Sequence, residues 1–230
     1  MGPDVPARPL TRSHASEFLE ATLVAVVFAL FVRTFLIQAF VVPTPSMERT
    51  VLTGDHVVVN KFVFGPRAFP AADRWLPRRS VRRGDVIVFK FPEDPRRDFV
   101  KRAVGLPGDE VEIRDKVVRI NGRRESAPRA MHSDGRVVPD DSGLPEALRR
   151  RDQVHPFRVP ENTIFALGDN RDNSYDSRFW GPVPSGNLKG RPLFVYWSQA
   201  PNGPRRRGPL RWIADFFAST RWSRTLLPVR

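Results

Sequence analysis

One long apolar run near the start of the chain constrains the fold most. From Phe18 to Val42 the residues are mainly apolar, and Leu23–Val32 carries no charge. A run of this length is sufficient to cross the hydrocarbon of a bilayer as a helix. Arg33 lies in its second half, where a long side chain can reach the interface and leave its stem in lipid. We predict a transmembrane helix over residues 16–42, with a buried core helix and a cleavable secretory signal as the alternatives.

The flanks of this run give less information. Residues 1–15 contain Pro, Arg and Ser without an apolar period, and we expect a flexible lead-in there. Two arginines precede the run, Arg8 and Arg12, and Arg49 and Lys61 follow it. Because positive charge is so evenly divided, the count of flanking cations does not set the orientation of the span.

After Pro43 the pattern changes to short runs typical of β-strands, separated by Gly, Pro and Asp. Asn121-Gly122 follows one of them and is a strong signal for a tight turn. No crossover-length helix separates the runs, which favours a mainly β, antiparallel-sheet domain over residues 43–200. The runs are His56–Asn60, Asp85–Phe91, Glu110–Ile113, Lys116–Ile120 and Leu193–Trp197.

Two segments interrupt or follow this β-rich region. Residues 123–154 are rich in Arg, Pro, Asp and Ser and indicate a surface insertion, with one short helix near residues 145–151. Residues 201–230 begin as a basic Pro/Gly linker and continue as an amphipathic helix over 210–227, where aromatic residues alternate with arginines. Such a helix either lies in a membrane interface or packs on the protein, and the sequence does not choose between them.

Composition excludes several classes of chemistry. The chain has no cysteine, so a disulfide, a thiolate metal site and a cysteine nucleophile are excluded. Its four histidines show no metal-ligand spacing, and we expect neither a metal nor a cofactor. The net charge of +13 suits anionic lipid, nucleic acid or an acidic partner, and charge alone does not decide among them.

Lysine is scarce in this basic chain. Of 38 basic residues only five are lysines. Arginine keeps its proton in proteins, whereas a desolvated lysine can lose it. A site that needs a neutral amine must therefore use one of these five, although codon bias explains most of the scarcity. The lysines are Lys61, Lys90, Lys101, Lys116 and Lys189.

Directly after the predicted span, Ser46 lies between prolines in the segment Val42–Thr50. A serine on such a stiff turn is exposed and pre-positioned, as a nucleophile must be. Taken alone, the segment favours an ordinary turn over a nucleophile. Its significance depends on two further blocks, Arg83–Asp109 and Gly168–Pro184.

In this order, the three blocks resemble the bacterial type I signal peptidase (leader peptidase) family of Ser/Lys serine proteases, over the span and most of the chain to about Trp197. The resemblance implies that Ser46 attacks the scissile carbonyl and that Lys101, as a neutral amine, accepts its proton. Apolar neighbours on a strand would lower the pKa of Lys101 toward neutrality. The resemblance also implies an oxyanion hole formed by the backbone N–H of Ser46 and the hydroxyl of Thr44.

Further residues receive supporting roles from the same resemblance. Ser174 matches a hydroxyl that orients the lysine amine, Asp176 and Arg178 match an ion pair beside the site, and Asp169 and Arg102 complete the supporting set. The sequence departs from the common family pattern in three places, and none of them removes a reacting atom. These departures are Pro45, Arg49 and Val51.

The resemblance implies a membrane-bound endopeptidase that removes N-terminal signal peptides from exported preproteins, with small residues at the −1 and −3 positions. It implies a single-pass protein of the bacterial inner membrane, with the catalytic domain on the extracytoplasmic side and lipid, not nucleic acid, as a neighbour. Two alternatives remain: a self-cleaving Ser/Lys regulator, and a membrane-tethered non-catalytic β module that binds a partner or anionic lipid. A penicillin-binding enzyme is excluded because Arg49 occupies the position where that class has its lysine.

Overall fold

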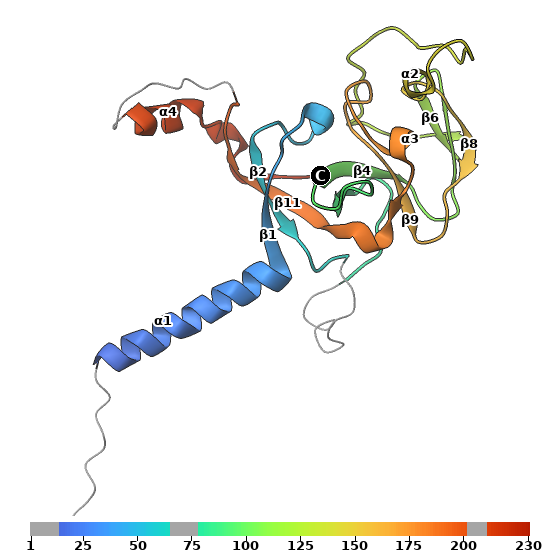
Figure 1. Cartoon of the computed structure of the whole chain (residues 1–230). Helices are drawn as coiled ribbons and strands as arrows, with labels where there is room; N and C mark the ends of the chain where they lie inside the picture. Colours follow the sequence, from blue (N-terminus) through green and yellow to red (C-terminus); the bar gives the residue numbers. More distant parts are fainter. Residues whose placement is uncertain (1–13, 65–77, 202–210) are drawn as a thin grey trace, which may run out of the picture. The chain divides into compact units, whose positions relative to one another are not determined.

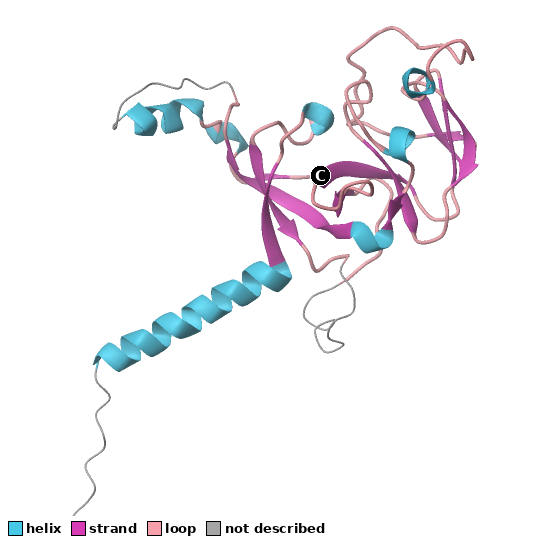
Figure 2. Cartoon of the chain, in the orientation of Figure 1, coloured by secondary structure: helices cyan, strands magenta, loops and turns pink. Residues whose placement is uncertain are grey.

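The computed structural model describes residues 14–64, 78–201 and 211–230. The chain divides into two compact units, Met1–Leu36 and Ile37–Arg230, which are described separately. Most of the expected N-terminal lead-in and most of the expected linker at 201–209 lie outside the described residues. Figure 1 gives the path of the chain and Figure 2 its secondary structure.

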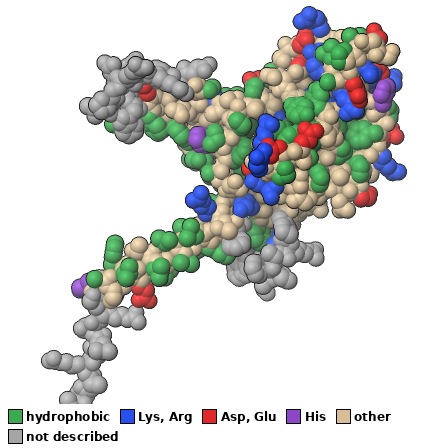
Figure 3. Space-filling model, viewed as in Figure 1, with side chains coloured by type: hydrophobic (Ala, Val, Ile, Leu, Met, Phe, Trp, Pro, Cys, Tyr) green, Lys and Arg blue, Asp and Glu red, His purple; other side chains and the backbone are tan. Residues whose placement is uncertain are grey.

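The first unit is an apolar helix. Helix α1 (His14–Phe31) continues into a π-helical turn, Val32–Leu36, and no residue of α1 is buried within the structure. Its hydrophobic side chains are exposed along its length (Figure 3). By length and composition the segment His14–Thr34 is able to cross a membrane. The predicted end of the helix at residue 42 is wrong, because Ile37–Val41 forms a strand.

The larger unit is built around an eight-stranded sheet. Its strands follow the order β1-β2-β11-β3-β4-β9-β10, and β12 also pairs with β11. Every pairing between named strands is antiparallel, which confirms the predicted fold class. The strands are β1 (Ile37–Val41), β2 (Asp55–Asn60), β3 (Val86–Lys90), β4 (Asp98–Gly105), β9 (Thr163–Leu167), β10 (Val183–Pro184), β11 (Leu188–Ser198) and β12 (Leu227–Pro228).

A second, four-stranded sheet has the order β7-β6-β5-β8 and is also antiparallel. The predicted insertion contributes β7 and one short helix to this region, and the rest of it is irregular. The remaining strands are β5 (Glu110–Arg114), β6 (Val117–Ile120), β7 (Arg123–Arg124) and β8 (Val154–Arg158). The short helices of this unit are η2 (Pro45–Met47), α2 (Glu146–Arg149), α3 (Ser177–Trp180), η4 (Ser185–Asn187), α4 (Arg211–Ser219) and η5 (Trp222–Arg224).

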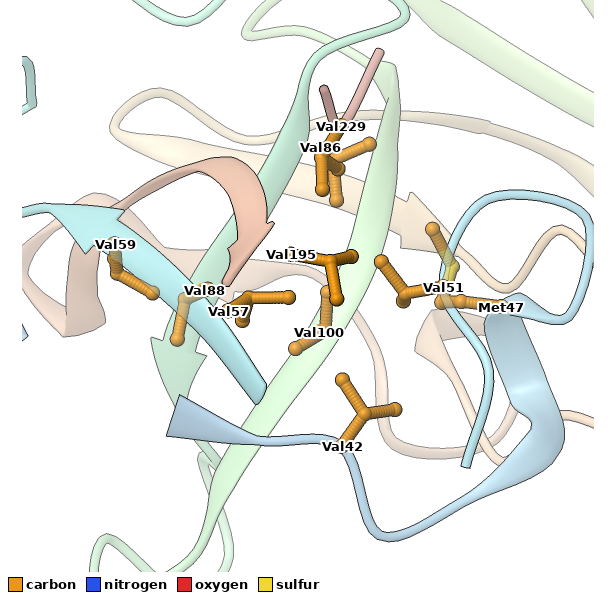
Figure 4. Packing of buried hydrophobic residues seen from close by; sticks show 10 residues of the cluster. All are labelled: Val42, Met47, Val51, Val57, Val59, Val86, Val88, Val100, Val195 and Val229. Carbon is orange, nitrogen blue, oxygen red and sulfur yellow. The ribbon is translucent and has the colours of Figure 1, made fainter. Parts of the chain in front are cut away.

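A valine-rich core supports the first turn after β1. Alternate residues of β2 point inward, and Val57 and Val59 are buried. Valines from β2, β3, β4 and β11 meet in one cluster that also holds Met47 and Val51 (Figure 4). β-branched side chains pack well on a pleated sheet, which explains their dominance here. The segment that carries Ser46 is thus anchored in the core through its neighbour Met47.

The C-terminal segment returns to the large sheet. Strand β12 pairs with β11, and Val229 is buried in the same core cluster. The carboxylate of Asp55 accepts hydrogen bonds from Arg224 at 2.6 Å and from Ser198 at 2.6 Å, which holds η5 against the sheet. The predicted boundary of the β-rich domain at residue 200 is therefore too early.

Candidate active site

Ser46 lies in the single 3₁₀ turn η2, directly after β1. Pro45 is the first residue of this turn, where a missing backbone N–H costs nothing because the first amides of a helix have no partner within it. The turn closes through Glu48 N–H, which donates to the carbonyl of Pro45 at 3.2 Å. The departure at Pro45 is thus compatible with the turn, and Ser46 is only 5% exposed.

Lys101 lies in the middle of β4 and is 3% exposed. Its Nζ lies 2.5 Å from Oγ of Ser46, in a hydrogen bond between residues 55 positions apart in the chain. The structure therefore brings the expected nucleophile and the expected base together. The ring of Phe99 also lies near the amine, with Nζ 5.5 Å from its centre.

The electrostatic setting of Lys101 favours a neutral amine. Burial lowers the pKa of Lys101 to about 8, while the charge of Asp176 opposes this shift and the charge of Arg178 adds to it. An amine with this pKa is substantially neutral near pH 8, as a general base must be. An arginine at this position would not lose its proton.

Asp176 and Arg178 form a buried ion pair next to the dyad. Arg178 Nε donates to Asp176 at 2.9 Å, and both side chains are almost completely buried. Burial alone would raise the pKa of Asp176, but the adjacent Arg178 and the N–H of Gly168 hold the pKa below its ordinary value. Asp176 also accepts from the backbone N–H of Arg178 at the start of α3. It therefore stays ionised, caps a helix and carries negative charge toward Lys101.

A second buried pair lies on the other side of the nucleophile turn. Arg102 donates two hydrogen bonds to Asp169, both at 2.7 Å, and Thr50 donates to the same carboxylate at 2.5 Å. The next residue, Asn170, donates its backbone N–H to the carbonyl of Ser46 at 3.0 Å. The sequence analysis did not single out Thr50 or Asn170, because their roles depend on contacts with residues more than 100 positions away.

The hydroxyls of Thr44 and Ser174, both predicted to belong to the site, differ in their contacts. Thr44 Oγ1 lies 3.4 Å from Oγ of Ser46, so it borders the reacting atom. The Ser174 hydroxyl is buried against Gly168 and has no hydrogen-bond partner among the described residues. The structure thus does not bring the Ser174 hydroxyl into a hydrogen bond with Lys101.

An apolar cleft of about 550 Å³ opens over the dyad. Two backbone segments, 40–47 and 97–101, form its walls, and Asn173 and Tyr175 complete it. Strand β4 pairs with β9 only from Arg102 onward, so its Asp98–Lys101 edge has no neighbouring strand on that side among the residues that the structure describes. An unpaired edge inside an apolar cleft is suited to an extended peptide.

No group of acidic or histidine side chains among the described residues has the arrangement of a metal site. The reacting groups in the cleft are a hydroxyl and an amine. A serine activated by a buried lysine is a known arrangement of acyl-transfer hydrolases, in which an amine replaces the histidine of the commoner triad.

Comparison with known proteins agrees with this class. The chain belongs to the family described as signal peptidase, peptidase S26, whose sequence profile matches residues 15–197. It is therefore a serine peptidase, and the resemblance inferred from the sequence is confirmed.

Two named relatives support the assignment. The chain is 32% identical over 217 residues to a signal peptidase I of Pseudomonas aeruginosa, covering 84% of this chain and 75% of the relative. It is 31% identical over 214 residues to a signal peptidase I of Aquifex aeolicus, covering 74% of this chain and 79% of the relative. A crystal structure of a signal peptidase I from Enterococcus faecalis matches 49% of this chain and 97% of that chain, at 31% identity and a TM-score of 0.37.

Proposed function

We propose that this protein removes N-terminal signal peptides from exported preproteins, with Ser46 as nucleophile and Lys101 as general base. One observation carries the proposal: a buried lysine amine of lowered pKa lies 2.5 Å from a serine hydroxyl. The substrate class follows from the relatives, which are named signal peptidase I.

In the proposed reaction, Ser46 Oγ attacks the scissile carbonyl carbon while its proton moves to the neutral Nζ of Lys101. The tetrahedral oxyanion accepts hydrogen bonds from the N–H of Ser46 and the hydroxyl of Thr44. The Lys101 ammonium then donates its proton to the leaving amine, and the peptide bond breaks to give an acyl-enzyme. Lys101 next takes a proton from water, which attacks the ester, and returns this proton to Oγ of Ser46 as the acyl product leaves.

The preprotein would bind as an extended strand between the two walls of the cleft. The free edge of Asp98–Lys101 offers backbone groups to pair with it. The cleft is lined mainly by apolar side chains that include Val42, Met47 and Phe99. The family of the chain implies small side chains at the −1 and −3 positions of the bound preprotein.

The proposed site of action is the outer surface of the bacterial inner membrane. Helix α1 would serve as a single-pass anchor, and exported preproteins present their signal peptides in the same bilayer. The proposal is supported by the length and apolar surface of α1 and by the family of the chain. Protease protection of tagged spheroplasts would test the orientation.

The decisive test uses purified full-length protein in detergent and a preprotein substrate. Ser46→Ala, Lys101→Ala and Lys101→Arg should each lower kcat/KM by at least about 10³-fold, since each removes the nucleophile or the neutral base. Lys90→Arg is the matched control, because Lys90 is exposed on the neighbouring strand, and it should keep wild-type turnover. Wild-type turnover by Lys101→Arg would defeat the proposed base, and absence of cleavage by the wild-type protein would favour a non-catalytic β module.

A further inference from the structure

One loop reaches both members of the dyad. We define the active-site loop as residues 168–176, between β9 and α3. Its Asn170 donates a backbone N–H to the carbonyl of Ser46 at 3.0 Å. Its Asp176 provides the largest charge that opposes the lowering of the Lys101 pKa by burial. The position of this loop therefore affects the nucleophile and the base together.

The active-site loop contains no strand or helix of its own, so its shape depends on outside contacts. The predicted insertion supplies two of them. Met131 N–H donates to the carbonyl of Asp169 at 2.7 Å, and Arg171 N–H donates to the carbonyl of Met131 at 2.9 Å. Arg171 also forms a 2.9 Å ion pair with Glu125, with the two side chains only 6% and 7% exposed.

A third contact comes from the hairpin between β5 and β6. Lys116 Nζ donates to Asp172 at 2.8 Å and to the carbonyl of Asp134 at 2.6 Å. The other carboxylate oxygen of Asp172 accepts the N–H of Asp134 at 2.8 Å. With side chains 9% and 3% exposed, Lys116 and Asp172 form a shielded ion pair that joins the hairpin, the insertion and the loop.

The backbone at Lys116 is unusual for this residue type. Asp115 and Lys116 form the two-residue turn of the hairpin with φ of 51° and 68°. Such turns favour Asn and Gly, and a lysine in this left-handed region is disfavoured. Strain of this kind persists where the surrounding structure or a function requires the side chain. The contacts of the Lys116 amine, rather than the turn, explain a lysine at this position.

We propose that Lys116 is a positioning residue for catalysis, which holds the active-site loop against the Ser46 turn through its ion pair with Asp172. The inference rests on the proposed function. It also gives a role to the four-stranded sheet and the insertion, which hold this loop through Lys116, Met131 and Glu125. We call these three residues the clamp.

Loss of the clamp would affect catalysis through the contact between the active-site loop and Ser46. When the loop loosens, Asn170 no longer fixes the carbonyl of Ser46, and the nucleophile loses its orientation toward Lys101. Misplaced reacting groups lower kcat, because positioning contributes directly to the barrier. Most of the cleft lining, at 40–47 and 97–101, lies outside the active-site loop, and only Asn173 and Tyr175 belong to it, so we expect KM to change less than kcat.

The experiment compares Lys116→Met and Lys116→Gly with wild type in full-length protein, with a preprotein as substrate. Both variants remove the amine, but Lys116→Gly also relieves the strained turn. We expect kcat to fall at least about tenfold in both, with KM within about threefold. The acid limb of the pH–rate profile should shift to lower pH, since a displaced Asp176 does less to keep Lys101 protonated.

Arg79→Met is the matched control. It breaks the 2.6 Å ion pair of Arg79 with Asp85, which lies outside the active-site loop, and should lower stability without changing kcat. A Lys116→Gly enzyme with wild-type kcat and pH profile overturns the proposal, even if its unfolding free energy has changed. If Lys116→Met does not fold, kcat, KM and the pH–rate profile of Asp172→Asn are measured instead. Absence of Ser46-dependent cleavage by the wild-type protein would instead refute the proposed function.

Discussion

The burial of Lys101 lowers the pKa of its amine, as the proposed reaction requires, and also lowers the stability of the folded protein. Its pKa in the folded protein is about 8, below the ordinary value of 10.5, because burial disfavours the charged amine. Between these two pH values the unfolded chain binds more protons than the folded one, so stability rises with pH in this window. Below about pH 8 the penalty for burying the charge is fully present.

We therefore predict that Lys101→Met stabilises the protein at pH 7 by up to about 3 kcal/mol, the free energy that corresponds to the shift. The gain should shrink between pH 8 and 10.5 and vanish above that range. Denaturant unfolding of the detergent-solubilised protein at several pH values measures it. Lys90→Met is the control, and an equal effect of the two variants at pH 7 would contradict the expected penalty.

At the scale of residues, the sequence was sufficient to predict that Ser46 and Lys101 lie together. Ser46 and Lys101 were identified from ordered motifs, and the structure brings their side chains into contact. It was not sufficient for Ser174, which does not reach Lys101, or for Asn170, which acts through its backbone. A backbone N–H has no residue-specific signature, so only the folded contact reveals it.

At the scale of elements, the close approach of the active-site loop to the nucleophile turn depends on a glycine. A Cβ added at Gly168 would lie 2.7 Å from the carbonyl oxygen of Ser46 and 2.5 Å from Cβ of Ser174. Real Cβ contacts are not this short, so one of the two segments would have to move.

Gly168→Ala should therefore lower kcat at least about tenfold, because the Ser46 turn is displaced from Lys101. Steady-state cleavage of a preprotein measures the change. Gly186→Ala provides the comparison, since a Cβ at Gly186 meets nothing within 4 Å, and it should leave kcat unaltered. Unchanged turnover by Gly168→Ala would mean that the loop can withdraw without affecting the dyad.

Element boundaries were the least predictable part of the fold. The apolar run continues through residues 37–41, and apolarity alone extends the helix across them. The structure instead pairs this segment with β2, because Ile37, Ala39 and Val41 alternate with Gln38 and Phe40 in a strand pattern. The return of β12 to the sheet was missed because two strand residues are too few for a periodic signal.

At the scale of the whole molecule, the structure shows the packing of residues 211–219 on the protein, and the membrane-interface interpretation of residues 210–227 stays a prediction. Phe216 stacks on Trp197 at 5.3 Å, so one side of α4 packs on the protein. Phe217 and Trp222 stack on each other and are 57% and 55% exposed. Exposed aromatic residues of this kind favour membrane interfaces.

We predict that the double variant Phe217→Ser, Trp222→Ser loses activity in lipid vesicles, by about tenfold, while it keeps wild-type activity in detergent. Turnover of one preprotein in both media measures the difference. Leu148→Ser removes an exposed apolar side chain near the second sheet and should behave like wild type in both. Equal activity of the double variant in vesicles and detergent would exclude a lipid contact.

The sheet order also bears on when the enzyme becomes active during its synthesis. Strands β1 and β2 flank the turn that carries Ser46, β4 carries Lys101 and pairs with β3, and β11 pairs with β2 and with β3. The nascent chain can form each half from local hairpins, but the halves join only after Leu188–Ser198 has left the ribosome. A chain whose synthesis has not yet passed β11 would thus be proteolytically inert.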